Sequence, residues 1–192
     1  MLNYQELREI YKPREIKCLL IAESPPRSGN KRFFYNPDQE EYDFLFKSVM
    51  KVIFSNFKNN YRRGQKHEYL QRFKEQGFYL IDAVDTPIND LDDCDRNQII
   101  RENLKNKIKE IEGLISKDTP IILIKKNVFE IFYTELKKRG FNVVHSEHIP
   151  FPSSWCQRKF KEKFKLCLER VSKSYEARTS DNTEYAPGLG PF

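Results

Sequence analysis

Residues 19–37 read LLIAESPPRSGNKRFFYNP, and the change of character within this stretch indicates the fold. An apolar run that begins at Cys18 gives way to an acid, Glu23, then to two prolines and a cluster of aromatic residues. A short apolar run bounded by turn residues is typical of a buried strand in a parallel sheet. We therefore expect a strand over residues 18–22 that ends at Glu23 and is followed by a stiff loop.

The rest of the chain alternates strand and helix patterns. Three more apolar runs rich in branched residues predict strands at residues 78–83, 121–124 and 141–145. Helical periods predict helices at residues 4–11, 40–57, 66–75, after Asp95, 128–139 and 154–172. Because such alternation implies crossover connections, we expect an α/β fold: a three-layer α/β/α sandwich with a central four-stranded parallel sheet.

Length and composition favour one domain. The chain has 192 residues, of which 39% are hydrophobic, and this is enough for a single core. From Ser174 the sequence SYEARTSDNTEYAPGLGPF has no apolar period and ends in proline and glycine. We therefore expect a domain over residues 1–173 and a flexible tail over residues 174–192.

Charge and cysteine usage limit the classes of partner and cofactor. Lysine and arginine outnumber the acids by 34 to 28, and the net charge of +6 favours a polyanionic partner without identifying one. The four cysteines form no Cys-x-x-Cys pair, so neither zinc nor an iron–sulfur cluster is predicted. No run approaches the about 18 apolar residues of a membrane span. We expect a cytoplasmic monomer that has no cofactor and no membrane partner.

Three loops are predicted to meet at one edge of the sheet, because the carboxyl ends of parallel strands share a rim. The first loop carries Glu23 and the aromatic residues that follow it, and the second begins at Asp82. The last carries FPSSW at residues 151–155. An acid, aromatic rings and the start of a helix should therefore converge.

These loops resemble the motifs of the uracil-DNA glycosylase superfamily. AESP places Glu23 where the thermostable branch carries a glutamate, and Ser24 where the best-known branch carries its catalytic aspartate. YLIDAV places Asp82 at the asparagine that reads the base, and FPSSW places Phe151 at a histidine and Trp155 at an apolar wedge. The resemblance implies a parallel α/β/α fold and a DNA repair glycosylase that flips the base out of the duplex.

The resemblance extends over residues 16–171, but only in these short motifs. It implies that Ser24 and Pro25 contact DNA beside the catalytic acid. Cleavage of an N-glycosidic bond builds positive charge on the sugar, so a carboxylate that positions water is needed, and Glu23 is the candidate. Alternatively, Glu23 caps the proline-rich turn or pairs with a lysine.

Aromatic and basic residues fit the handling of a flipped nucleotide. Phe33, Phe34 or Tyr35 is predicted to stack on the extruded base, and Trp155 to wedge into the gap that it leaves. Ordinary core packing is the alternative for any one of these rings. Either of the serines at residues 153–154 can cap the last helix while the free backbone N–H groups of that helix hold a DNA phosphate, and capping alone is the alternative. The basic residues that follow can track the DNA backbone or form a solvated helix face; they include Arg158 and Lys159.

Two residues depart from the family pattern. An ionised Asp82 only accepts hydrogen bonds, so it favours a base edge with two donors, as in guanine-like bases, or a cytosine-like edge if the acid is protonated. Alternatively, Asp82 caps the turn before Asp85. Phe151 cannot donate to the leaving base, so His148, Ser153 or a backbone N–H would have to do so.

The sequence thus favours a DNA glycosylase-like hydrolase that acts on a flipped-out, damaged or modified base. Two alternatives stay open. One is a catalytically silent module of the same fold that binds nucleic acid or a nucleotide. The other is an enzyme that hydrolyses a free nucleoside or nucleotide, whose affinity would respond little to salt.

Overall fold

The computed structural model describes residues 3–27, 32–38 and 43–181, with the backbone alone for 177–181. Three parallel strands form one sheet in the order β2-β1-β3: β1 is Cys18–Ala22, β2 is Phe78–Asp82 and β3 is Ile121–Leu123. Every residue of the three strands is buried, as expected for a parallel sheet covered on both faces. The predicted α/β class is confirmed.

The register aligns the ends of β1 and β2. Ala22 pairs with Asp82, and beyond this pair the Val84 N–H donates to the Glu23 carbonyl at 3.2 Å. The first and second loops therefore leave the sheet side by side, as the sequence predicts.

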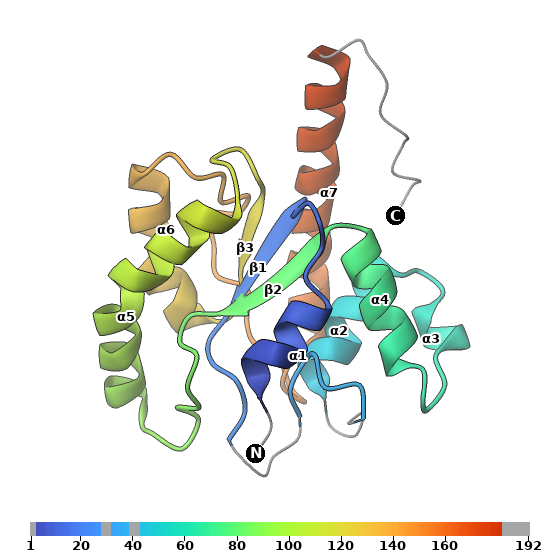
Figure 1. Cartoon of the computed structure of the whole chain (residues 1–192), viewed down its shortest axis with the longest axis horizontal. Helices are drawn as coiled ribbons and strands as arrows, with labels where there is room; N and C mark the ends of the chain where they lie inside the picture. The colour runs from blue at the N-terminus through green and yellow to red at the C-terminus, as the bar shows by residue number, and fades with distance from the viewer. Residues whose placement is uncertain (1–2, 28–31, 39–42, 182–192) are drawn as a thin grey trace.

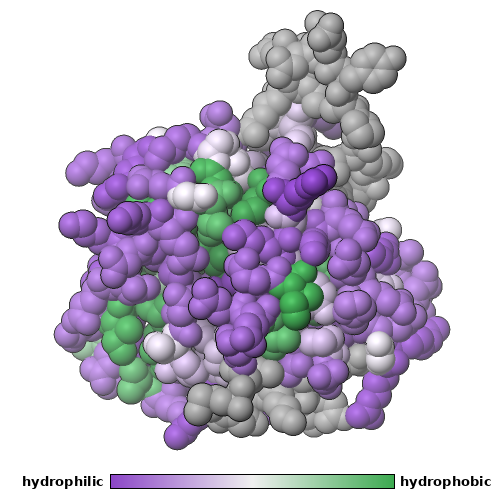
Figure 2. Space-filling model, in the orientation of Figure 1, coloured by the Kyte–Doolittle hydropathy of each residue, from purple (hydrophilic) through white to green (hydrophobic). Residues whose placement is uncertain are grey.

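Seven helices lie in the described chain, and they connect and cover the strands (Figure 1). They are α1 (Tyr4–Ile10), α2 (Phe44–Ile53), α3 (Phe57–Asn60), α4 (Lys66–Glu75), α5 (Asp93–Leu114), α6 (Lys126–Lys138) and α7 (Gln157–Asp181). In Figure 1, α5 and α6 lie together on one side of the sheet, and α2 and α4 lie on the other. The face seen in Figure 2 is mostly hydrophilic, with separate small apolar areas.

The helix predicted over residues 40–57 is shorter than expected and is followed by a second, short helix. Asp43 begins α2, because its Oδ1 accepts the Phe46 N–H at 3.0 Å and thereby caps the first turn. The helix ends at Ile53, and α3 starts separately at Phe57. Residues 39–42 lie outside the described residues.

The segment predicted as a fourth strand, residues 141–145, does not form one. It meets β3 at one isolated parallel bridge, Ile121 with Val143, where the Ile121 N–H donates to the Asn142 carbonyl at 2.8 Å. A second isolated bridge joins Ile124 and Ile149, just beyond the two segments. Between these bridges a side chain replaces the backbone acceptor: the Leu123 N–H donates to Nε2 of His145 at 2.9 Å. Nδ1 of His145 lies 2.8 Å from the Glu147 carbonyl, which fixes the ring. The histidine side chain therefore accepts the hydrogen bond of an N–H at the edge of β3, and the backbone ladder of the predicted fourth strand is interrupted there.

The last helix differs from its prediction at both ends. It begins at Gln157 rather than 154, and it continues to Asp181, so the predicted boundary at residue 173 falls inside α7. In Figure 1 this helix projects beyond the other elements. The flexibility of the tail stays a prediction, and residues 182–192 lie outside the described residues. Among the described helices, none combines the length and the apolar character that a membrane span requires.

Candidate functional site

A cavity of about 480 Å³ opens where β1 and β2 end. Three separate loops contribute to its wall, as the shared rim of a parallel sheet predicts. The residues singled out from the sequence that line it are Glu23, Ser24, Phe33, Phe34, Asp82, Phe151 and Ser153. The structure thus brings the acid that follows β1 and the loop before α7 to one cavity.

Glu23 is held by two side chains from the start of α6. The residue is 7% exposed, and its Oε2 accepts from Nζ of Lys125 at 2.5 Å. Its Oε1 accepts from Nδ2 of Asn127 at 2.6 Å. The lysine pairing considered as an alternative is therefore present. It fixes the direction of a carboxylate that still borders the cavity.

Lys125 adopts a backbone conformation that is rare for any residue but glycine. Its φ is +89° and its ψ is 145°. Hydrogen bonds on both sides maintain this conformation: the Lys125 N–H donates to the Ile149 carbonyl at 2.8 Å, and the Phe129 N–H donates to the Lys125 carbonyl at 3.1 Å. Such strain costs about 1–3 kcal/mol and is concentrated at functional sites. No local pattern in the sequence indicates this strain, because Lys125 and Lys126 look like ordinary surface residues.

The loop that follows β1 is anchored on both sides of Glu23. The Tyr4 hydroxyl of α1 donates to the Pro26 carbonyl. Ser24 lines the cavity, and its buried Oγ has no hydrogen-bond partner among the described residues. Pro25, predicted to contact DNA, is buried and does not line the cavity, so that contact is not supported.

Asp82 ends β2 and is almost completely buried, at 3% exposed. Its Oδ2 accepts from Nη2 of Arg8, in α1, at 2.8 Å. Burial raises the pKa of Asp82 to about 6, although the positive charges of Arg8 and Lys107 act in the opposite direction. Asp82 is therefore half of a buried ion pair rather than a cap of the following turn. Arg8 binds Oδ2 of Asp82, so Oδ1 is the oxygen that can meet a ligand in the cavity.

The ion pair between Asp82 and Arg8 belongs to a larger network of charged side chains at the end of β2. Nη1 of Arg8 donates to Oδ1 of Asp85 at 3.1 Å, and Nζ of Lys107 lies 3.0 Å from Oδ2 of Asp85. Burial acts to raise the pKa of Asp85, but Lys107 and Arg8 outweigh it and lower that pKa. The network connects α1, β2 and α5 and fixes the end of β2.

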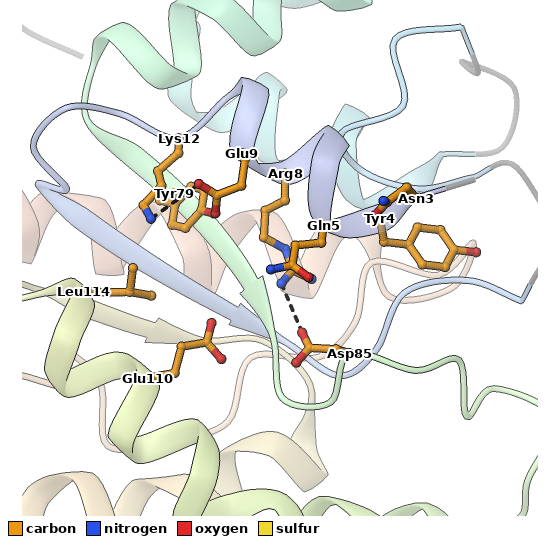
Figure 3. A pocket seen from close by; sticks show the side chains of 10 residues that line it. All are labelled: Asn3, Tyr4, Gln5, Arg8, Glu9, Lys12, Tyr79, Asp85, Glu110 and Leu114. Atoms are coloured by element: carbon orange, nitrogen blue, oxygen red, sulfur yellow. Dashed lines mark hydrogen bonds and ion pairs between the residues drawn. The ribbon is translucent and has the colours of Figure 1, made fainter. Parts of the chain in front are cut away.

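This network borders a second cavity, of about 670 Å³ (Figure 3). Arg8 and Glu9 project into it from α1 and Lys12 from the segment that follows, while Glu110 and Leu114 border it from α5. None of the residues predicted for catalysis, base binding or DNA binding lines this cavity.

The aromatic cluster divides between the cavity and the core. Phe33 and Phe34 line the cavity, although they are only 2% and 3% exposed. Tyr35, predicted as a stacking platform, is a core residue: its ring stacks on Tyr11 at 5.8 Å, and its hydroxyl accepts the Leu80 N–H at 2.7 Å. This internal hydrogen bond holds Tyr35 against the sheet and away from the cavity.

A buried ion pair holds the aromatic loop in place. Nζ of Lys66, at the start of α4, is 2.6 Å from Oδ2 of Asp43 and donates to the Phe33 carbonyl at 3.1 Å. The Lys66 side chain is completely buried, and that of Asp43 is 2% exposed. The sequence did not reveal this anchor, because Asp43 and Lys66 look like surface residues.

The loop before α7 offers an apolar edge and an exposed ring. Phe151, at 39% exposed, lines the cavity, whereas Trp155, at 95% exposed, does not. Since α7 begins at Gln157, the predicted capping of this helix by the serines at residues 153–154 is wrong. Both serines lie in the preceding loop and are exposed. The side chains of Arg158 and Lys159 are also exposed, in the first turn of α7.

Three positively charged residues in the cavity wall were not anticipated: Arg32, Arg96 and Lys125. Nη1 of Arg96 lies 4.0 Å from Oε2 of Glu23. Nη2 of Arg96 bonds to Asp93, and its buried Nε has no hydrogen-bond partner among the described residues. Arg96 lies in the first turn of α5, after the N-cap Asp92, and it was not singled out from the sequence. The wall therefore holds cations suited to an anionic ligand or leaving group.

The histidines do not supply the missing donor at the cavity. His145 is committed to the Leu123 N–H, and the exposed His148 does not line the cavity. In the described part of the chain, no group of three or more His, Cys, Asp or Glu side chains is arranged to hold a metal ion.

Comparison with known proteins finds neither a family model nor a curated protein that matches this chain. The observations that bear on its function are therefore the residues that line the cavity.

Proposed function

We propose that this protein is a divergent member of the uracil-DNA glycosylase superfamily, which hydrolyses the N-glycosidic bond of a flipped-out, damaged or modified base in DNA. The observation that carries the proposal is the meeting of Glu23, Asp82 and Phe151 with two phenyl rings in one cavity. Its volume, about 480 Å³, lies within the range of small-ligand sites. Where the family has a fourth strand, this chain has a segment that meets the edge of the sheet only at isolated bridges, those of Val143 and Ile149.

Glu23 is the proposed catalytic carboxylate. Its carboxylate positions a water molecule against C1′ and stabilises the positive charge that develops on the sugar. Lys125 and Asn127 hold it in one orientation, so little reorganisation is needed as the bond breaks. Arg96 and Lys125 stand in the same wall and can stabilise the departing base as an anion. They replace the donor that Phe151 cannot provide.

The floor of the cavity sets the proposed base preference. Asp82 uses Oδ2 to hold Arg8, which leaves Oδ1 to meet the base. As an ionised group Oδ1 accepts a hydrogen bond from an N–H or amino group, whereas uracil O4 at this place would be repelled. Protonation of Asp82, with a pKa of about 6, would turn it into a donor for a cytosine-like edge. Phe33 or Phe34 provides the stacking surface.

The proposed DNA surface surrounds the cavity mouth on the side of α7. Trp155 is placed for insertion into the base stack, because its ring is 95% exposed and follows a loop whose Phe151 and Ser153 line the cavity. Ser154, Arg158 and Lys159 continue this exposed surface, and the two basic side chains suit phosphate contacts.

Single-turnover base release tests the proposal. A panel of duplex and single-stranded oligonucleotides that carry uracil, deaminated purines and alkylated or oxidised bases is incubated with excess protein. We expect release of a guanine-like or cytosine-like base in preference to uracil. Glu23→Gln keeps the size of the side chain, and it should lower the rate about 10²–10⁴-fold. Strong uracil release would contradict the assignment of Asp82, and equal rates for both proteins would contradict that of Glu23.

The second candidate is a silent binding module, and a specific observation favours it: both oxygens of Glu23 already have partners, Lys125 and Asn127. Such a module would retard the same oligonucleotides in a gel and leave every base attached. Trp155→Ala should weaken that binding in either case, by about 1–3 kcal/mol, because base stacking on the ring is lost. Base release that depends on Glu23 excludes the module.

A further inference from the structure

Lys125 places an amine in the cavity wall, next to Glu23. Its side chain borders the cavity and is 26% exposed, so a bound molecule can contact this side chain. Nζ also lies 2.5 Å from Oε2 of Glu23, the group proposed to act at C1′. A general base next to a nucleophile is one way in which enzymes activate it, and here the Glu23 carboxylate is the base that can take a proton from the amine.

The backbone is strained to bring this amine to the cavity. Lys125 has a φ of +89°, where glycine would be free of strain, and it precedes the first residue of α6, Lys126. Two backbone hydrogen bonds hold this conformation: the Lys125 N–H donates to the Ile149 carbonyl, and the Phe129 N–H donates to the Lys125 carbonyl. A lysine that served only to neutralise Glu23 could be supplied from an unstrained position, as Arg96 shows from α5 at 4.0 Å. The strain therefore points to a requirement for the amine itself.

We propose that Lys125 condenses with the C1′ aldehyde of an abasic site and gives the protein DNA lyase activity. The inference rests on the proposed function, because base hydrolysis in the same cavity would supply the abasic site. It adds a second activity: cleavage of the strand 3′ to the site from which the base was lost.

The chemistry is redox-neutral and needs no further reactant. Glu23 takes a proton from the Lys125 ammonium, and the free amine adds to C1′ of the ring-opened sugar. Loss of water from the adduct gives a protonated imine. The imine acidifies C2′, so a base removes a proton there and the C3′–O bond breaks, with its electron pair leaving on the phosphate. Water then hydrolyses the imine, which restores Lys125 and releases an unsaturated aldehyde on the 5′ fragment.

No other lysine described in or near the cavity offers the same combination. Lys66 is completely buried and bonded to Asp43 and the Phe33 carbonyl. Lys126 is adjacent to Lys125, but its side chain is 67% exposed and pairs with Glu130. Lys126 therefore serves as a matched control for a general surface amine.

The experiment uses the full chain and DNA that carries a preformed abasic site, so that it does not depend on base release. Sodium borohydride reduces an imine to a stable protein–DNA crosslink, which migrates slowly in a denaturing gel. We expect wild-type protein and Lys126→Arg to crosslink equally. Lys125→Arg keeps the positive charge beside Glu23 but cannot form an imine, and it should lose more than about tenfold of the crosslink. Mass spectrometry of the digested adduct should place the modification on Lys125.

Lys125→Gly provides the second variant, because glycine relieves the strain and should fold at least as well as the arginine form. Loss of crosslinking in both variants supports the proposal. Crosslinking by Lys125→Arg at the wild-type level, or none by wild-type protein, overturns it. Base release without crosslinking would contradict the proposed lyase activity and leave the proposed glycosylase activity standing. Crosslinking without base release would contradict the glycosylase activity alone.

Discussion

Glu23 and Asp82 are acids at the ends of neighbouring strands, and both are paired with cations, yet their surroundings differ. The partners of Glu23 come from α5 and α6 across a cavity and remain partly exposed, at 26% for Lys125 and 19% for Arg96. The partner of Asp82, Arg8, is only 7% exposed in its side chain. The cations that surround Glu23 are therefore accessible to a ligand, whereas Asp82 is fixed within a network that stabilises the fold.

The largest effect should come from breaking the buried pair of Asp82. Arg8→Met leaves that carboxyl buried without a partner, and we expect a loss of about 3–5 kcal/mol in the free energy of unfolding. Arg96→Met is the matched control at the cavity. It removes a cation whose Asp93 partner is exposed, and it should cost less than about 1 kcal/mol. Urea unfolding measures both, and equal losses would refute the distinction between the two acids.

His145 provides the next largest effect. His145→Ala removes the acceptor of the buried Leu123 N–H and should cost about 1–3 kcal/mol. The effect should depend on pH, because burial lowers the pKa of His145 below its usual 6.5, with Arg170 and Lys163 acting in the same direction and the Glu147 carbonyl against them.

The sign of this dependence follows from the neutral ring that the fold requires. The stabilisation by His145 should be complete above about pH 6.5 and should diminish as the pH falls below that value. Urea unfolding at a series of pH values from about 5 to 8 tests this, because a histidine side chain changes its charge in that interval. In His145→Ala this part of the slope should vanish, and an unchanged slope would contradict the role of the ring.

Asp82 should give a pH dependence of the opposite sign. Burial raises its pKa from 3.8 to about 6 in the fold. The protonated form is therefore favoured by folding, and its contribution should be present below pH 3.8 and lost as the pH rises through about 6. Asp82→Asn cannot titrate, so the difference in unfolding free energy between wild type and variant should change across this interval. A difference that is constant with pH would mean that Arg8 keeps the acid ionised throughout.

The fold could be predicted from sequence wherever a pattern is local. Apolar runs give β1 and β2, and the order of strands and helices gives the parallel sheet. The fourth strand was mispredicted because the pattern VVH looks like strand, whereas the His145 side chain replaces a backbone acceptor there. A side chain that substitutes for backbone leaves no periodic signal.

The candidate site could be predicted only in part for a related reason. Glu23, Asp82 and Phe151 follow apolar strands or motifs, and the shared rim of the sheet brings them together. Lys125, Arg96 and the pair of Lys66 with Asp43 depend on contacts between residues far apart in sequence. In a chain with 34 lysines and arginines, nothing local distinguishes those few from solvated charges.

The smallest predicted effect isolates the strain at Lys125. Alanine and glycine both remove its ammonium group, so the loss of the Glu23 pair is the same in the two variants. Only glycine relieves a φ of +89°, and Lys125→Gly should be more stable than Lys125→Ala by about 1 kcal/mol. At Lys126, the first residue of α6, the order should reverse, with alanine more stable than glycine by about 0.5–1 kcal/mol. If alanine is the better residue at both positions, Lys125 is not strained, and its backbone conformation is then no sign that the fold holds the amine in the cavity for chemistry.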